Sequence, residues 1–175
     1  SHAAGQLEVG DVIVEIDNCK VGSDGTVAVL KDCELGTTHL LEEARKHKVA
    51  RFIFASSSSV YGGNTHTPFS ESHQVPNPES PYAATKRAGE LLCKTYHHLY
   101  AGNGTFESMV CLRFFTVYGP WGRPDMAPMI FTKAILSGDK INIFNNGEMM
   151  RDFTYIDDVV DGILGCIYKS AESSE

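Results

Sequence analysis

The chain has 175 residues, and 15 Lys and Arg against 22 Asp and Glu give it a formal net charge of −7. Its length allows one domain with a real core, and its 42% hydrophobic residues argue against intrinsic disorder. The acidic balance argues against a dedicated nucleic-acid-binding protein, which needs a concentrated basic face. No apolar run could span a membrane, and no secretory signal opens the sequence. We therefore expect a cytoplasmic protein, or one anchored to a membrane only through residues outside this chain.

The cysteines and histidines indicate neither a disulfide framework nor a metal site. The five cysteines are widely spaced and form no C-x-x-C pair, which is typical of reduced intracellular thiols. None of the seven histidines stands in an H-x-x-x-H or H-E-x-x-H arrangement. We therefore expect no bound metal.

Apolar runs alternate with helical patterns along most of the chain. The predicted strands are 12–16, 51–55, 109–112, 141–144 and 153–155, and the predicted helices are 35–47, 81–99, 130–136 and 156–168. Stretches rich in Gly, Pro and polar residues predict loops at 62–80 and 116–128. Alternating strands and helices from residue 35 onward predict an α/β domain with a largely parallel sheet.

The sharpest chemical pattern is Ser57 followed by Tyr82 and Lys86. Tyr82 and Lys86 are four residues apart on a predicted helix that Ser80 caps, so their side chains share one face. A lysine ammonium beside a phenol stabilises the phenolate, and the helix dipole acts in the same direction. Such a tyrosine can exchange a proton with a sugar or alcohol hydroxyl. For an isolated Y-x-x-x-K match, the alternative is an ordinary surface pair.

The match is not isolated, because five ordered blocks resemble one family. The blocks are Phe54–Gly62, Ser80–Lys86, Leu112–Pro120, Arg123–Met126 and Arg151–Val159. They resemble the extended short-chain dehydrogenase/reductases, which are NAD-dependent nucleotide-sugar epimerases and dehydratases. The resemblance implies an incomplete Rossmann-like parallel sheet with helices on both faces, plus the start of a small substrate-binding domain. We expect this partial domain over residues 33–175, with residues 1–32 unassigned or an insertion.

The family resemblance also implies catalytic roles. It places the hydroxyl that binds the reacting sugar at Ser57, beside Tyr82 as the base, and it makes Tyr82 and Lys86 NAD contacts. The next two positions are typically Asp and Glu in the dehydratases, and decarboxylating relatives usually keep the Glu. Here they are Ser58 and Ser59, which cannot eliminate water but are candidate substrate contacts. The family reaction that remains possible is a reversible hydride transfer at C4 of the sugar, through a 4-keto intermediate.

A second part of the resemblance indicates which sugar is the substrate. The segment that holds Thr116 and Arg123 is similar to that of UDP-glucuronate 4-epimerases, where these positions hold the sugar carboxylate. A guanidinium suits that task because it can grip a carboxylate with two hydrogen bonds. Arg151 resembles an arginine that contacts the nucleotide diphosphate. The alternatives are a loop-rim charge for Arg123 and an ion pair with Asp152 or Asp157 for Arg151.

One family element is missing from the sequence. No G-x-x-G-x-x-G turn, which would seat the NAD pyrophosphate at a helix N-terminus, is present. Residues 2–5 faintly resemble a later strand end beside the cofactor, which makes Ala4 a candidate NAD contact; the alternative is a tag remnant at residues 1–2. Residues 6–30 depart further. They fit an insertion or an irregular gene model better than a relationship to PDZ modules.

Three functions follow from these observations. The first is an NAD-dependent 4-epimerase, expected to be a homodimer, that converts the small-molecule nucleotide sugar UDP-glucuronate to UDP-galacturonate. The second is another epimerase or decarboxylase of the same family. The third is a non-catalytic relative or an incompetent fragment. Ser57, Tyr82 and Lys86 argue against the third function, whereas the absent glycine-rich turn favours it.

Overall fold

The structure is a computed structural model that describes residues 13–15, 28–143 and 145–168. The chain divides into two compact units. The first comprises residues 1–114 with residues 166–175, and the second comprises residues 115–165. Among the described residues, the first unit contains a three-stranded parallel sheet and the second a two-stranded parallel sheet.

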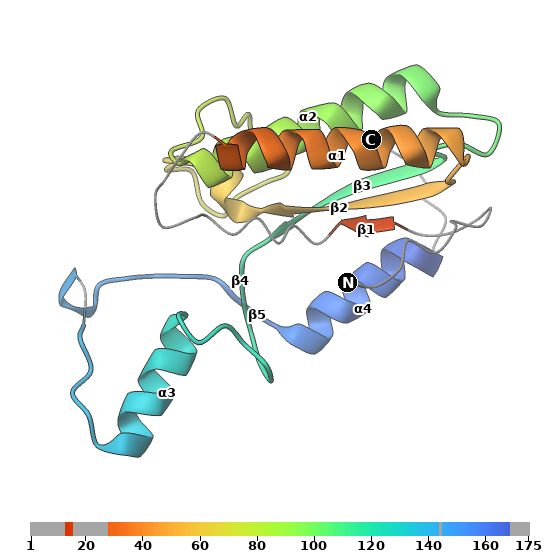
Figure 1. Cartoon of the computed structure of the whole chain (residues 1–175). Helices are drawn as coiled ribbons and strands as arrows, with labels where there is room; N and C mark the ends of the chain where they lie inside the picture. The colour runs from red at the N-terminus through yellow and green to blue at the C-terminus, as the bar shows by residue number, and fades with distance from the viewer. Residues whose placement is uncertain (1–12, 16–27, 144, 169–175) are drawn as a thin grey trace. The chain divides into compact units, whose positions relative to one another are not determined.

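The sheet of the first unit is parallel and has the order β1-β2-β3. Its strands are β1 (Ile13–Glu15), β2 (Arg51–Ser57) and β3 (Ser108–Phe114). Two helices, α1 (Ala28–Lys46) and α2 (Pro81–Tyr100), lie side by side along one face of this sheet (Figure 1). This arrangement confirms the predicted parallel α/β fold. It also shows that β1, within the segment that we left unassigned, belongs to the same sheet.

The core of the first unit lies between this sheet and the two helices. Three consecutive apolar residues of the central strand β2, Phe52, Ile53 and Phe54, are all buried, so the side chains on both faces of this strand are shielded from solvent. Phe52 meets the ring of Phe106 edge to face at 6.2 Å between centroids. Each buried ring contributes roughly 1.5–3 kcal/mol. The remaining core residues are Leu41, Ala44, Val49 and Cys93.

Helix α2 begins where the sequence predicts. The hydroxyl of Ser80 accepts a hydrogen bond from the backbone N–H of Ala83 at 3.1 Å, and Pro81 occupies the first helical position. The helix ends at Tyr100. The left-handed glycines Gly102 and Gly104 follow it, with φ of 123° and 83°. Tyr82 and Lys86 therefore lie on one regular helix.

The second unit contains a two-stranded parallel sheet of β4 (Thr116–Tyr118) and β5 (Phe153–Tyr155). Strand β4 falls within the predicted loop 116–128, so that prediction was wrong over three residues. The predicted strand at 141–144 was also wrong over residues 141–143, because β4 and β5 pair with each other and residues 141–143 join no ladder. Residue 144 lies outside the described residues.

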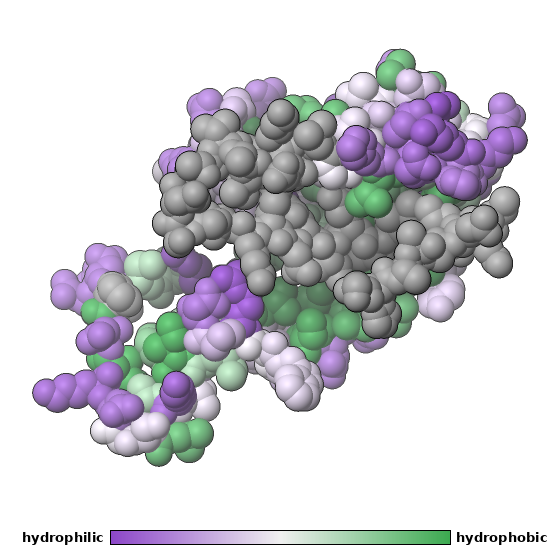
Figure 2. Space-filling model, in the orientation of Figure 1, coloured by the Kyte–Doolittle hydropathy of each residue, from purple (hydrophilic) through white to green (hydrophobic). Residues whose placement is uncertain are grey.

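Helices and connecting loops follow these strands in the chain or lie between them. Helix α3 (Ala127–Ser137) is followed by the short turn η2 (Asn145–Gly147), and helix α4 (Ile156–Tyr168) closes the described chain. Apolar side chains reach the surface over α3 (Figure 2), among them Ile135 and Leu136. No helix within the described ranges is long and apolar enough to cross a membrane.

Candidate active site

The serine run forms a short turn at the carboxyl end of β2. Ser57 caps a 3₁₀ helix, η1 (Ser58–Tyr61), and its hydroxyl oxygen accepts hydrogen bonds from the backbone N–H of Ser59 at 3.2 Å and from the Ser59 hydroxyl at 3.0 Å. Tyr61 ends the turn, and its buried ring stacks on Phe69 with 4.5 Å between centroids. The turn is therefore fixed at both ends, and Ser57 lies at its start.

Tyr82 and Lys86 share one face of α2, near its N-terminus. The Lys86 ammonium nitrogen lies 5.7 Å from the centroid of the Tyr82 ring and 5.4 Å from that of Phe54. Lys86 is only 3% exposed, whereas Tyr82 is 43% exposed. A buried cation is thus held beneath a phenol that solvent and small molecules can reach.

The topology brings Ser57 and Tyr82 to one edge of the sheet. β2 and β3 run in the same direction, so the connecting helix α2 begins at the edge where β2 ends. Helix α2 also packs against η1 (Figure 1). The carboxyl edge of an open parallel sheet is where α/β proteins bind their ligands. The structure therefore supports one site at this edge that contains both residues.

Helix α2 packs closely against strand β2 at Gly89. Gly89 lies directly over the Phe54 ring, and a Cβ atom at this position would overlap the tip of that ring. A residue without a side chain is required here. This contact brings the next residue, Glu90, against the sheet.

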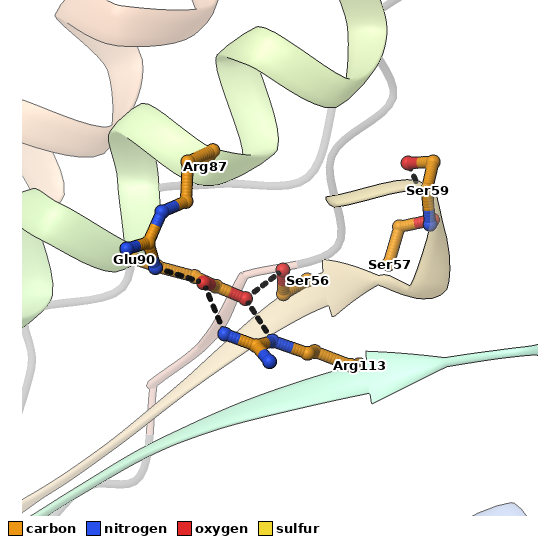
Figure 3. Close-up of polar contacts among 6 residues, drawn as sticks. All are labelled: Ser56, Ser57, Ser59, Arg87, Glu90 and Arg113. Carbon is orange, nitrogen blue, oxygen red and sulfur yellow. Dashed lines mark hydrogen bonds and ion pairs between the residues drawn. The ribbon is translucent and has the colours of Figure 1, made fainter. Parts of the chain in front are cut away.

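Glu90 forms a buried polar cluster with Ser56, Arg87 and Arg113 (Figure 3). Burial alone would raise the pKa of Glu90, but hydrogen bonds from Arg113, Ser56 and Arg87 outweigh burial and hold that pKa below its usual value. The hydrogen bond to Glu90 likewise raises the pKa of Arg113.

We did not predict a role for Glu90. The available signals were its spacing of four from Lys86 and the arginine at the end of an apolar strand.

The other candidate residues of the sequence lie in the second unit. The Thr116 backbone N–H donates to the carbonyl of Asp152 at 3.1 Å and so joins β4 to the segment before β5. Arg123 is exposed and donates two hydrogen bonds to the Asp125 carboxylate, one of them at 3.0 Å. Exposed Arg151 donates to the carbonyl of Met150 at 3.0 Å. Ala4 lies outside the described residues.

Two negative findings concern metal sites and thiols. Within the described ranges, no group of three or more His, Cys, Asp and Glu side chains could hold a metal ion. Cys93, Cys111 and Cys166 form no disulfide bond.

Comparisons with known proteins give the family. The model of the NAD dependent epimerase/dehydratase family matches residues 12–174. UDP-glucuronate 4-epimerase 6 of Arabidopsis thaliana is 51% identical over 143 residues, which cover 79% of this chain and 30% of that protein. In general, the chain spans less than half the length of the curated relatives it matches.

Solved structures show the same relationship in three dimensions. UDP-glucuronic acid 4-epimerase from Bacillus cereus, in complex with UDP-glucuronic acid and NAD, is 38% identical with a TM-score of 0.74, over 85% of this chain and 45% of that one. The NAD-dependent NDP-hexosamine 5,6-dehydratase TunA is 28% identical with a TM-score of 0.80, over 94% and 55%. The chain therefore belongs to the NAD-dependent epimerase/dehydratase family of nucleotide-sugar enzymes.

Proposed function

We propose that this protein is an NAD-dependent nucleotide-sugar 4-epimerase that interconverts UDP-glucuronate and UDP-galacturonate. The observation that carries the proposal is the buried Lys86 ammonium, 5.7 Å from the accessible Tyr82 ring at the carboxyl edge of the sheet. The turn after Ser57 supplies hydroxyls and no carboxylate, which favours epimerisation over elimination.

The residues at this edge fit the nicotinamide end of the family's cofactor. Lys86 offers up to three N–H donors from a buried position, which suits the hydroxyls of a ribose. Tyr82 lies beside it and can contact the same ribose. Bound NAD supplies the acceptance and return of a hydride at C4 of the sugar. The remaining steps belong to side chains of this chain.

Tyr82 is proposed to remove and return the proton of the sugar 4-hydroxyl. The Lys86 ammonium lies 5.7 Å from the ring centroid, and Tyr82 stands in the first turn of α2, where the helix dipole gives a positive potential. Ser57 is proposed to hydrogen-bond the same sugar oxygen and so to hold its proton toward Tyr82. An oriented pair of this kind contributes through general base catalysis and positioning.

Ser58 and Ser59 are proposed to contact the substrate and to keep the reaction at C4. Loss of water from a sugar requires a group that donates a proton to the leaving hydroxyl and another that removes a proton from carbon. Serine hydroxyls do not ionise near neutral pH, and the Ser59 hydroxyl is already bonded to Ser57. The family's second reaction, dehydration, therefore lacks its acid and base here.

Recognition of the sugar carboxylate is assigned to Thr116 and Arg123, with Arg151 on the diphosphate. Arg123 already holds a carboxylate, that of Asp125, with both its Nε and an Nη atom. This pair lies in an exposed loop, so its net stabilisation is small and a substrate carboxylate can replace Asp125. The fork geometry is the one that a glucuronate carboxylate requires.

We also propose that the protein is a homodimer that pairs through α1 and α2. Apolar residues remain exposed on these helices, among them Leu40, Leu91 and Leu99. A pair of helices from each copy would cover them. Light scattering of the purified protein would give the mass of two chains, whereas the mass of one chain at micromolar concentration would contradict this proposal.

The reaction is tested by incubating the protein at its full natural length with NAD and UDP-glucuronate and resolving the product sugars. The proposal expects UDP-galacturonate. UDP-xylose as the product would instead indicate a decarboxylase. Conversion of UDP-glucose to UDP-galactose, without conversion of UDP-glucuronate, would contradict carboxylate recognition.

A further inference from the structure

We propose that Glu90 is a positioning residue that holds the catalytic turn and the catalytic helix in register. Its carboxylate joins three elements that carry or border the site: β2, β3 and α2. The inference rests on the proposed 4-epimerase function. It adds a residue outside the catalytic group, with a role that can be separated from folding.

The carboxylate accepts four hydrogen bonds, so both of its oxygens are used twice. Oε1 accepts from the Ser56 hydroxyl at 2.6 Å and from Arg113 Nε at 2.8 Å. Oε2 accepts from an Nη atom of Arg113 and from one of Arg87, each at 2.9 Å. Figure 3 shows these four bonds, and the Glu90 side chain that accepts them is 5% exposed. Charge-assisted bonds in such surroundings are strong and directional.

The position of Glu90 on α2 couples it to Tyr82 and Lys86. These three residues follow each other at intervals of four along one helix and therefore share a face. A side chain that fixes the helix at Glu90 also fixes the height and rotation of Tyr82 above the sheet. A shift of about 1 Å between reacting groups can reduce a rate roughly 100-fold.

The same cluster holds both ends of the serine turn. At its start, Ser56 is tied to Glu90, and the next residue along the backbone is Ser57. At its end, the Arg113 guanidinium lies over the Tyr61 ring, 4.8 Å from the centroid. Glu90 thus orients Arg113 by two parallel hydrogen bonds, and Arg113 supports Tyr61. The turn that carries Ser57 is held between these two contacts.

The alternative is that Glu90 serves stability alone. Buried ion pairs are weak evidence for stability, because the cost of removing both charges from water offsets much of their attraction. A positioning role makes a different prediction, namely a loss of turnover in protein that remains folded. It also predicts that Ser56, which bonds Glu90 without carrying charge, shares the effect.

The test compares Glu90→Gln and Ser56→Ala with the matched control Glu43→Gln in the protein at its full length. Glu43 is also a helical glutamate in an ion pair, with Lys46, but its side chain is 50% exposed on α1. We expect kcat to fall about 10- to 100-fold in Glu90→Gln and less in Ser56→Ala, with KM within about twofold. The control should match wild type. The double variant should be no slower than Glu90→Gln, because both changes act through one contact.

Amide hydrogen exchange supplies a readout that does not depend on turnover. Glu90→Gln should accelerate exchange within residues 57–61, whereas Glu43→Gln should not. Unchanged kcat and unchanged exchange in folded Glu90→Gln would overturn the proposal. If Glu90→Gln does not fold, the same result in Ser56→Ala would overturn it. If wild type converts no nucleotide sugar, the proposed function fails, and exchange in residues 57–61 alone decides the positioning role.

Discussion

The Lys86 ammonium lies one helical turn from Tyr82 and 5.7 Å from the centroid of its ring. The two residues differ sharply in exposure, because Lys86 packs against Phe54 of β2 whereas Tyr82 stands in the first turn of α2. The base proposed for the reaction is therefore accessible to a substrate, and the cation beside it is held in a buried position.

Tyr82→Phe should reduce kcat by about 100- to 10,000-fold, because the variant keeps the ring and loses the proton acceptor. Steady-state kinetics with UDP-glucuronate would measure the change. Tyr100→Phe is the matched control, since Tyr100 lies on the same helix at its far end, beside Arg45. Full activity in Tyr82→Phe would rule out the proposed base.

Gly89→Ala should destabilise the protein by about 1–3 kcal/mol, because the new Cβ atom would overlap the Phe54 ring. Gly36→Ala should do the opposite. Gly36 lies within α1, and no described atom outside its own helix backbone lies within 4 Å of an added Cβ, so the change should stabilise the helix by roughly 0.5–1 kcal/mol. Denaturant unfolding would measure both. Equal effects of the two substitutions would contradict the close approach of α2 to β2.

The stability of wild type should depend on pH through Glu90. Hydrogen bonds from three side chains lower the pKa of folded Glu90 despite its burial, whereas the unfolded chain has a value near 4.5. The stabilisation is therefore fully present above about pH 4.5 and is lost as the pH falls through the lower pKa of the folded state. Glu90→Gln lacks this titration. Its free energy of unfolding should fall less steeply below pH 4.5 than that of wild type. Parallel curves would show that Glu90 is not stabilised as a carboxylate.

Arg123→Lys should raise KM for UDP-glucuronate about 10-fold or more, because lysine keeps the charge but loses the two-pronged grip on a carboxylate. Asp125→Asn is the informative partner variant. It removes the carboxylate that now holds the Arg123 guanidinium and should lower KM or leave it unchanged. A rise in KM of equal size in both variants would indicate that the pair only shapes the loop.

The sequence alone predicted the part of the fold that depends on local pattern. Short stretches of sequence were enough to predict the Ser80 cap, the following helix and the apolar strands at 51–55 and 109–112. Strand β4 was missed because its backbone pairs with β5, far along the chain, and nothing in Thr116–Tyr118 itself records that partner. Strand formation in such short segments depends on tertiary context.

The residues of the candidate site were likewise predicted only in part from the sequence. The spacing of Tyr82 and Lys86 was visible because a helix places residues four apart on one face. Glu90 was not predicted, because a glutamate in a helix is usually solvent-exposed. Only the approach of Arg113 from another strand shows that this carboxylate is buried and paired. Long-range ion pairs of this kind leave little signal in a single sequence.

In the proposed reaction, a hydride leaves C4 of the sugar and returns to the same carbon while Tyr82 moves the hydroxyl proton. The direct test uses UDP-glucuronate that carries deuterium at C4, incubated with NAD and the protein at its full length. The account predicts UDP-galacturonate that retains the deuterium at C4. Loss of the label from C4, or conversion of the sugar to any product other than its C4 epimer, would contradict it.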